Sequence, residues 1–142
     1  MPMISLEVAI AIAQRAFEEG KKRNVLNMSV VVTDPGGHVR LGMRADGQGI
    51  FGIETARGKA ISALGFNRPS LQLSKTFGAE ATAAISGVTG GRFVPLGGAV
   101  IVRDGANNIV GAAAVSGGAP AVDEEIIAAA CEAAGFVVAR SE

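Results

Sequence analysis

The sequence predicts a single α+β domain, residues 1–142, in which helices cover an antiparallel sheet. The prediction depends on two strand–turn–strand patterns and on three helical patterns that precede, separate and follow them. Strands joined by a tight turn become antiparallel neighbours, and helices must then cover the apolar faces of the sheet. The expected order is therefore helix, hairpin, helix, hairpin, helix.

The first helix and the first hairpin are marked by spacing and by turn residues. Apolar residues recur at three- and four-residue spacing over 6–19, which is typical of an amphipathic helix. Ser5 is a suitable N-cap and Gly20 a suitable stop. The turn sequence Asp34-Pro-Gly-Gly37 separates two apolar runs, which predicts a hairpin. The strands of that hairpin are expected at 28–33 and 38–43.

The second half of the chain repeats this organisation. A helix is expected over 50–64, ended by Gly65, and a last helix over 121–134 with Pro120 in its first turn. Between them, the strands 99–103 and 109–115 flank the turn sequence 104–108. The result is an α+β sandwich of the profilin-like or PAS-like kind. Residues 66–96 are harder to assign: a short helix through Lys75 and an alanine-rich stretch at 79–84 precede several glycines, and long connections are often functional.

The composition of the chain excludes several classes of function and of binding site. The chain has 49% hydrophobic and 18% charged residues, a net charge of +0 and a pI of about 6.6, which gives no electrostatic basis for binding nucleic acid or an anionic membrane. Cys131 is the only cysteine, so an internal disulfide and a cysteine metal cluster are excluded. The amino terminus lacks the pattern of a signal peptide or a membrane span, so a reducing cytoplasm is expected. One histidine and no close carboxylate pair make a metal site unexpected, and no serine-hydrolase or phosphate-loop motif is present.

Five short motifs occur in a characteristic order, with Asp123 beyond the last. They are Val31-Val-Thr-Asp-Pro-Gly-Gly-His-Val39, Met43-Arg-Ala-Asp-Gly47, Ala56-Arg-Gly-Lys-Ala60, Gly97-Gly98 and Gly111-Ala-Ala-Ala-Val-Ser-Gly117. Their order and spacing resemble the GlcG/HbpS family of haem-binding-like proteins. The resemblance implies a profilin-like sandwich, a homo-oligomer, and haem or another small ligand in some members. The chain departs from the family pattern in three places. The family often has Arg-Met-Asp-Gly at 44–47 and Gly-Gly-Val-Pro-Ile at 97–101, and no family motif matches residues 66–96. These departures leave the identity of the ligand open.

Haem iron needs an axial His, Cys, Met or Tyr. The chain has one histidine, His38, and no tyrosine. His38 follows a turn, so we expect it near the surface. Haem is therefore compatible with the composition, and any ligation through histidine must use His38.

A small carboxylated ligand is the other candidate. Arg44 offers a guanidinium fork for a carboxylate, and Lys59, inside an apolar helix, needs a partner such as Glu54 or Asp46. Backbone amides and a hydroxyl could complete an anion site. The donors expected there are Gly97, Gly98 and Ser116. We expect these groups to meet at one cleft; the alternative is that the charges form only a structural ion-pair cluster.

Two functions stay open at this point. The first is a binding module that holds haem or a similar ligand without turnover, with Arg44, Gly97, Gly98, Ser116 and His38 as the ligand-binding residues. The second is a catabolic enzyme, of hydrolase or tautomerase type, acting on a small unsaturated carboxylate or imine. In that case Arg44 would bind the carboxylate, and Glu54, Asp46 or Lys59 would move protons as the catalytic residues.

Overall fold

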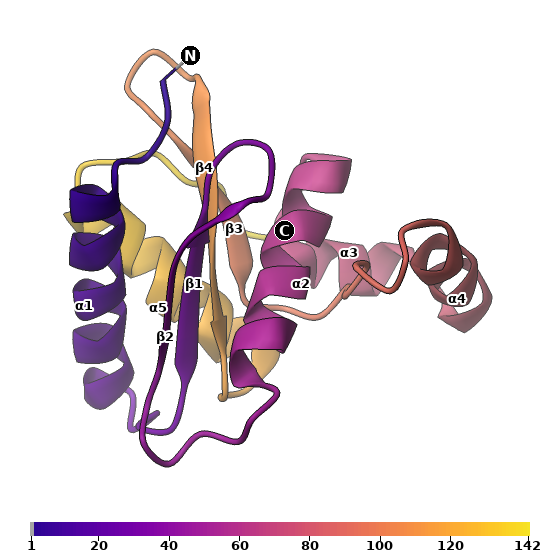
Figure 1. Cartoon of the computed structure of the whole chain (residues 1–142), viewed down its shortest axis with the longest axis horizontal. Coiled ribbons are helices and arrows are strands. Elements are labelled where there is room, and N and C mark those ends of the chain that lie inside the picture. Colours follow the sequence, from indigo (N-terminus) through magenta and orange to yellow (C-terminus); the bar gives the residue numbers. More distant parts are fainter. Residues whose placement is uncertain (1) are drawn as a thin grey trace.

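The computed structural model describes residues 2–142 as a four-stranded antiparallel sheet with five helices (Figure 1). The strand order is β2-β1-β4-β3, so the two hairpins join through their β1 and β4 strands. The expected α+β class and antiparallel sheet are confirmed. The elements are α1 (Leu6–Lys22), β1 (Ser29–Thr33), β2 (Val39–Arg44), α2 (Gly52–Phe66), α3 (Ser70–Thr76), α4 (Ala79–Val88), β3 (Ala99–Arg103), β4 (Ile109–Ser116) and α5 (Pro120–Ala133).

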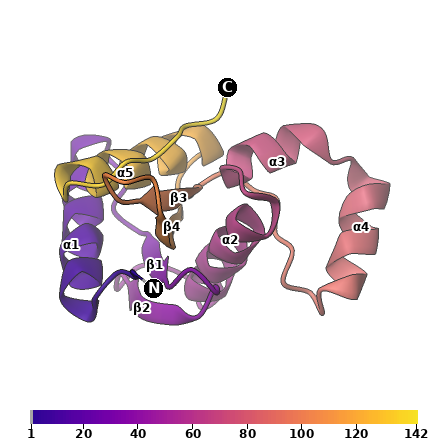
Figure 2. The same ribbon diagram turned by 90° about the horizontal axis from the view of Figure 1, so that it is seen from above.

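The sheet separates two apolar layers. Helices α1 and α5 pack on one face and α2 packs on the other (Figure 2). Side chains alternate between the faces of a strand, so Val30 and Val32 enter the core with α1 and α5, whereas Val31 faces α2. Both central strands are buried on both faces, which explains why they are continuous apolar runs.

Helix boundaries depart from the expectation at two glycines. Ser5 caps α1 as predicted, accepting a hydrogen bond from the Val8 amide at 3.1 Å, but α1 continues through Gly20 to Lys22. A Cβ at Gly20 would lie 2.7 Å from the Val25 carbonyl oxygen, so this glycine permits close chain approach rather than ending the helix. Likewise α2 continues through Gly65 to Phe66, and its C-cap is Asn67, which has a left-handed φ of 54°.

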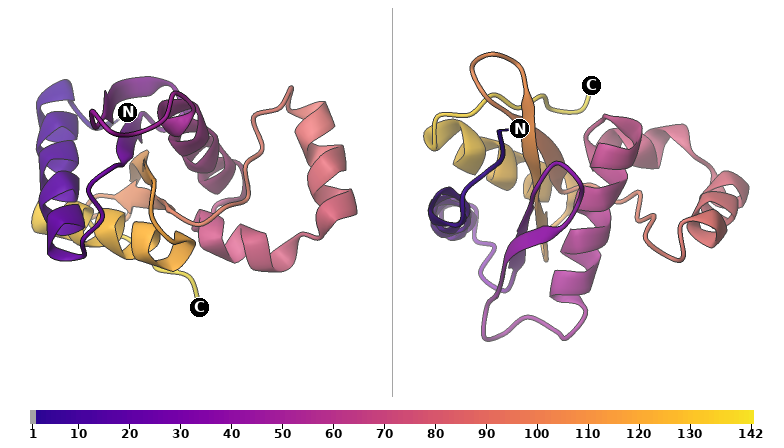
Figure 3. Two further views of the ribbon diagram at one scale, coloured as in Figure 1. Left: turned by 90° about the horizontal axis from the view of Figure 1, so that it is seen from below. Right: turned by 45° about the horizontal axis from the view of Figure 1, so that its top comes forward.

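Residues 66–96 form the part of the fold that the sequence left unassigned. Helices α3 and α4, which we call the arm (residues 70–88), extend away from the sheet, and residues 89–98, the return loop, lead back to β3 (Figures 1 and 3). No residue of α4 is buried. Three phenylalanine rings, with centroids 5.0–5.6 Å apart, pack together at the base of the arm: Phe66, Phe77 and Phe93.

Within residues 2–142, no helix combines the length and the apolar character that crossing a membrane requires.

Candidate functional site

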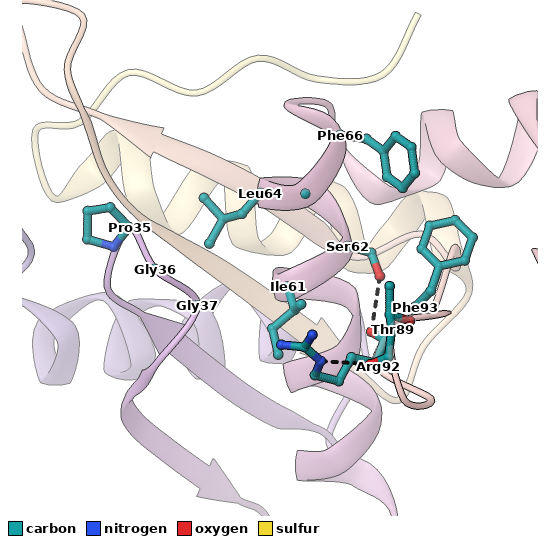
Figure 4. A pocket seen from close by; sticks show the side chains of 11 residues that line it. Pro35, Gly36, Gly37, Ile61, Ser62, Leu64, Phe66, Thr89, Arg92 and Phe93 are labelled. Carbon is teal, nitrogen blue, oxygen red and sulfur yellow. Dashed lines mark hydrogen bonds between the residues drawn. The ribbon is translucent and has the colours of Figure 1, made fainter. Parts of the chain in front are cut away.

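The main candidate site is a pocket of about 340 Å³ formed by three segments that are distant in sequence (Figure 4). The β1–β2 turn contributes Pro35 to Gly37, the second half of α2 contributes Ile61 to Phe66, and the return loop contributes Thr89, Arg92 and Phe93. Its volume falls at the lower end of the range for small-molecule sites, roughly 300–1,000 Å³. The wall is mostly apolar and aromatic, with the Arg92 guanidinium at one side.

The turn above the pocket is fixed by local chemistry. The Asp34 carboxylate accepts hydrogen bonds from the amides of Gly36, at 2.9 Å, and His38, at 3.0 Å. Gly37 has a φ of +82°, and a Cβ there would lie 3.3 Å from the Ile61 side chain. A glycine therefore lets the turn pass closely over α2.

The return loop is attached to α2 by a single hydroxyl. Ser62 Oγ donates to the Gly58 carbonyl at 2.7 Å and accepts from the Val94 amide at 2.7 Å. A Cβ at Gly58 would lie 2.4 Å from the Val94 side chain, so glycine is what allows the loop to approach the helix. Within the loop, Arg92 Nε donates to the Thr89 carbonyl at 2.8 Å, which orients the guanidinium (Figure 4).

A second pocket of about 300 Å³ adjoins the first, since Ile61 and Arg92 line both. Its other lining residues include the charged Glu54 and Arg57 on α2 and the glycines at 90 and 91. We call the two pockets together the α2 groove. One end of the α2 groove is apolar and aromatic, and the other end carries two guanidinium groups and one carboxylate.

His38 follows the turn residues 35–37 that line the apolar end, but it lines neither pocket itself. Its ring contacts Gly36, where a Cβ would lie 3.0 Å from the ring, and its side chain is 83% exposed, as the sequence predicted for a surface position. Nδ1 lies 3.2 Å from Asp34 Oδ1. Burial alone would raise the pKa of Asp34, but hydrogen bonds from the His38 and Gly36 amides outweigh it and hold that pKa below its ordinary value. An ionised Asp34 favours the proton on Nδ1 and leaves Nε2 free as a ligand.

Lys59 lies outside the α2 groove, in a closed ion pair. Its side chain is 5% exposed, its Nζ donates to the Val115 carbonyl at 2.9 Å, and Nζ lies 3.6 Å from Asp123 Oδ2. Burial lowers the pKa of Lys59 and raises the pKa of Asp123, although each charge opposes the shift of the other. The partner of Lys59 is therefore Asp123 and neither Glu54 nor Asp46, which corrects that expectation.

The other predicted site residues are divided between different places. A Cβ at Gly98, which has a φ of +133°, would lie 2.9 Å from Lys59 Nζ, so these two do meet. Arg44 donates to the Gln48 carbonyl at 3.3 Å on the edge strand β2, with Ser29 of β1 between it and Ser116 of β4.

The remaining predicted residues occupy three further environments. Asp46 lies exposed in the turn after β2, and Glu54 lines the charged end of the α2 groove. Gly97 packs against Pro120 and Leu71, where a Cβ would lie within 2.8 Å of each.

Sequence reasoning missed several residues that build the α2 groove, above all Phe66, Phe93 and Arg92. Phe66, Phe93 and Arg92 all fall in the unassigned segment 66–96. The available signal was that half of the chain's six phenylalanines, at 66, 77 and 93, fall in or border that segment. Aromatic side chains concentrated in an otherwise small-residue segment indicate a packed or binding surface.

The fold and the groove define a small α+β domain with a cleft formed by α2, the β1–β2 turn and the return loop. The chain belongs to the HbpS-like family, described as haem degrading protein HbpS-like, whose model matches residues 4–132. A search of the curated proteins gave no match.

Solved structures share the fold over nearly the whole chain. A structure described as a PduOC:haem complex is 21% identical, with a TM-score of 0.82 and 99% of each chain covered. The Klebsiella pneumoniae protein ORFY is 21% identical, with a TM-score of 0.85, and the match covers 94% of this chain and 92% of that one. A double mutant of Streptomyces reticuli HbpS is 26% identical, with a TM-score of 0.79, over 95% of this chain and 89% of that one.

Proposed function

We propose that this protein binds haem in the α2 groove, as a binding module. The observation that carries the proposal is the groove itself: an apolar, aromatic pocket that continues into a pocket with two guanidinium groups. The haem complex of a structurally similar protein and the family membership support it.

The residues present fit haem on three counts. Phe66, Phe93 and Ile61 offer apolar surface to a planar macrocycle, and Arg57 and Arg92 offer charge to its acid side chains. The candidate axial donor is His38, at the edge of the pocket-lining turn, whose contact with the Asp34 carboxylate is the arrangement that orients histidine ligands at metal sites. When bound, haem would supply an iron centre for ligand binding or electron transfer; the chain's own residues hold, orient and partly shield it.

The alternative of an enzyme acting on a small unsaturated carboxylate has no observation in its favour. Lys59, the strongest candidate for moving a proton, is closed off by Asp123 and the Val115 carbonyl. Neither Arg44 nor Lys59 lines the α2 groove.

We also propose that the 14.3 kDa chain forms a homo-oligomer and resides in the cytoplasm. Several large apolar side chains are exposed, among them Val88 at 86% and Ile50 at 75%, which is typical of surfaces that pack against another chain. A single, buried cysteine without a disulfide partner is typical of proteins in a reducing compartment. Light scattering at micromolar concentration that gave the mass of one chain would contradict the oligomer, and cell fractionation tests the location.

Haem titration followed by absorbance tests the proposed function. The matched variants are Gly65→Leu, which fills the apolar end of the α2 groove, and Gly87→Leu on α4 outside it. At both positions an added Cβ meets nothing within 4 Å, so both variants should fold. We expect a Soret band shift for the wild type and for Gly87→Leu, and a strongly weakened one for Gly65→Leu. Unchanged binding by Gly65→Leu, or no shift for the wild type, would refute haem binding in this groove.

The axial ligand is tested separately. His38→Ala should change the position of the Soret band, because it removes the only histidine, and Asp34→Asn should produce a smaller change. A spectrum identical to that of the wild type would show that His38 is not the axial ligand, and it would leave the proposal of haem binding unchanged.

A further inference from the structure

The charged end of the α2 groove contains ionised groups that do not neutralise one another. Glu54 and Arg57 lie one helical turn apart on α2, and Arg92 faces them from the return loop. Among residues 2–142, the salt bridges involve other side chains, and none joins these three. Their charges are therefore available to a ligand.

The backbone of the return loop brings Arg92 to this position. Gly90 and Gly91 have φ values of +66° and +81°, a pair of left-handed residues that turns the chain back from α4 toward α2. The hydrogen bond from Arg92 Nε to the Thr89 carbonyl uses one edge of the guanidinium and leaves both terminal nitrogens free. The Arg57 side chain makes no hydrogen bond or salt bridge within residues 2–142, so its whole guanidinium is available to a ligand.

We propose that Arg57 and Arg92 recognise the acid side chains of a planar apolar ligand, and that Glu54 opposes them to set how much negative charge the groove accepts. The proposal rests on haem binding in the α2 groove and assigns to it a ligand orientation: macrocycle at the apolar end, carboxylates at the charged end. Guanidinium groups bind carboxylates through paired, charge-assisted hydrogen bonds, whereas a carboxylate in the same pocket repels them. Affinity then depends on the ligand's free acid groups as well as on its ring.

The alternative is that Glu54 and Arg57 form a solvated surface ion pair with no role in ligand binding, as residues three apart on a helix often do. Two features argue against it. First, Glu54 and Arg57 lie beyond ion-pair distance. Second, the return loop holds another cation, Arg92, at the same pocket. The left-handed turn at Gly90 and Gly91 that places it there serves no packing role, because a Cβ at either glycine would meet nothing within 4 Å.

The test compares haem with its dimethyl ester, which keeps the ring and iron but carries no acid group. Arg57→Gln and Arg92→Gln should each weaken haem binding roughly five- to tenfold, the scale of an exposed charge-assisted contact, and should leave ester binding unchanged. Glu54→Gln should tighten haem binding roughly two- to fivefold and should also leave ester binding unchanged. Arg15→Gln, on the exposed surface of α1, is the matched control and should change neither.

The outcomes separate this proposal from the proposed function. If the wild type binds haem and ester equally and the three variants change both or neither, charge recognition is overturned while haem binding stands. If the wild type binds neither ligand, both proposals fall. Arg92→Lys keeps the charge while losing the fork, so intermediate binding by that variant would show that Arg92→Gln acts through charge and not through a loosened loop.

Discussion

Removing one member of the buried Lys59–Asp123 pair should destabilise the fold far more than removing both. The two side chains are 5% and 1% exposed, so each charge depends on the other and on two backbone contacts. Lys59→Met leaves the Asp123 carboxylate without its cation, and Asp123→Asn leaves the ammonium with only the Val115 carbonyl. Breaking a buried pair from one side costs about 3–5 kcal/mol in the free energy of unfolding.

The double variant Lys59→Met/Asp123→Asn should lose less than either single variant. Neither buried charge remains, a methionine of similar length fills the space, and the asparagine oxygen can still accept the Gly118 amide, which lies 2.9 Å from Asp123 Oδ1. Chemical denaturation followed by circular dichroism is the assay, because the chain has neither tryptophan nor tyrosine. Arg57→Met, exposed on the same helix, is the control and should stay within about 0.5 kcal/mol of the wild type. Single variants whose costs are small, or simply add in the double variant, would refute the reasoning.

The pair also predicts how stability depends on pH. Burial raises the pKa of Asp123, so the native state retains a proton that the unfolded chain has lost, and the contribution of Asp123 falls as pH rises from its ordinary pKa of 3.8 through the raised value. Burial lowers the pKa of Lys59, so its contribution increases as pH rises from the lowered value toward the ordinary 10.5. As pH rises, the free energy of unfolding of the wild type, relative to that of the double variant, should fall across the acid range and rise again across the alkaline range. A constant difference over both ranges would contradict these shifts.

Three further outcomes are expected. Gly98→Ala should lower the free energy of unfolding by more than about 1 kcal/mol, because the residue has a φ of +133° and a Cβ there would lie 2.4 Å from the Val115 carbonyl oxygen. Gly65→Ala, on an exposed part of α2, should instead raise it by about 0.5–1 kcal/mol, and thermal melting compares the two variants. Cys131 is fully buried and its pKa is raised to about 12, so a thiol reagent at pH 8 should modify it only after denaturant is added; rapid labelling of the native protein would contradict this. Val88→Asp should lower the mass measured by light scattering if α4 packs against a second copy, and an unchanged mass would exclude α4 from the interface.

Local chemistry was enough to predict most of the fold. The Asp34-Pro-Gly-Gly37 turn, the Ser5 cap and the strand 99–103 each depend on residues that are neighbours in sequence, and each is confirmed. The glycines at 20 and 65 were misjudged as helix ends. Gly20 instead permits close approach of the chain at Val25, and Asn67 rather than Gly65 supplies the left-handed residue after α2; only the packed structure shows either.

The α2 groove could not be predicted in this way. Its walls come from a turn, a helix and a loop that approach one another only in three dimensions, and the ring packing of Phe66 with Phe93 follows no helical or strand period. Lys59 was recognised as needing a partner, yet Asp123 lies on a different helix, and no spacing rule connects the two. Burial demands a counter-charge without specifying which element supplies it.

One wall of the α2 groove is a core helix and another is the return loop, and this division has an evolutionary consequence. Substitutions in α2 are constrained by its packing on the sheet, whereas the loop glycines at 90 and 91 are free of core packing. A lineage can therefore exchange the outer wall of its binding site while inheriting the inner wall unchanged. The same division makes the arm together with most of the return loop a segment suited to grafting: transplanting residues 67–96 between relatives should transfer ligand preference without rebuilding the sheet.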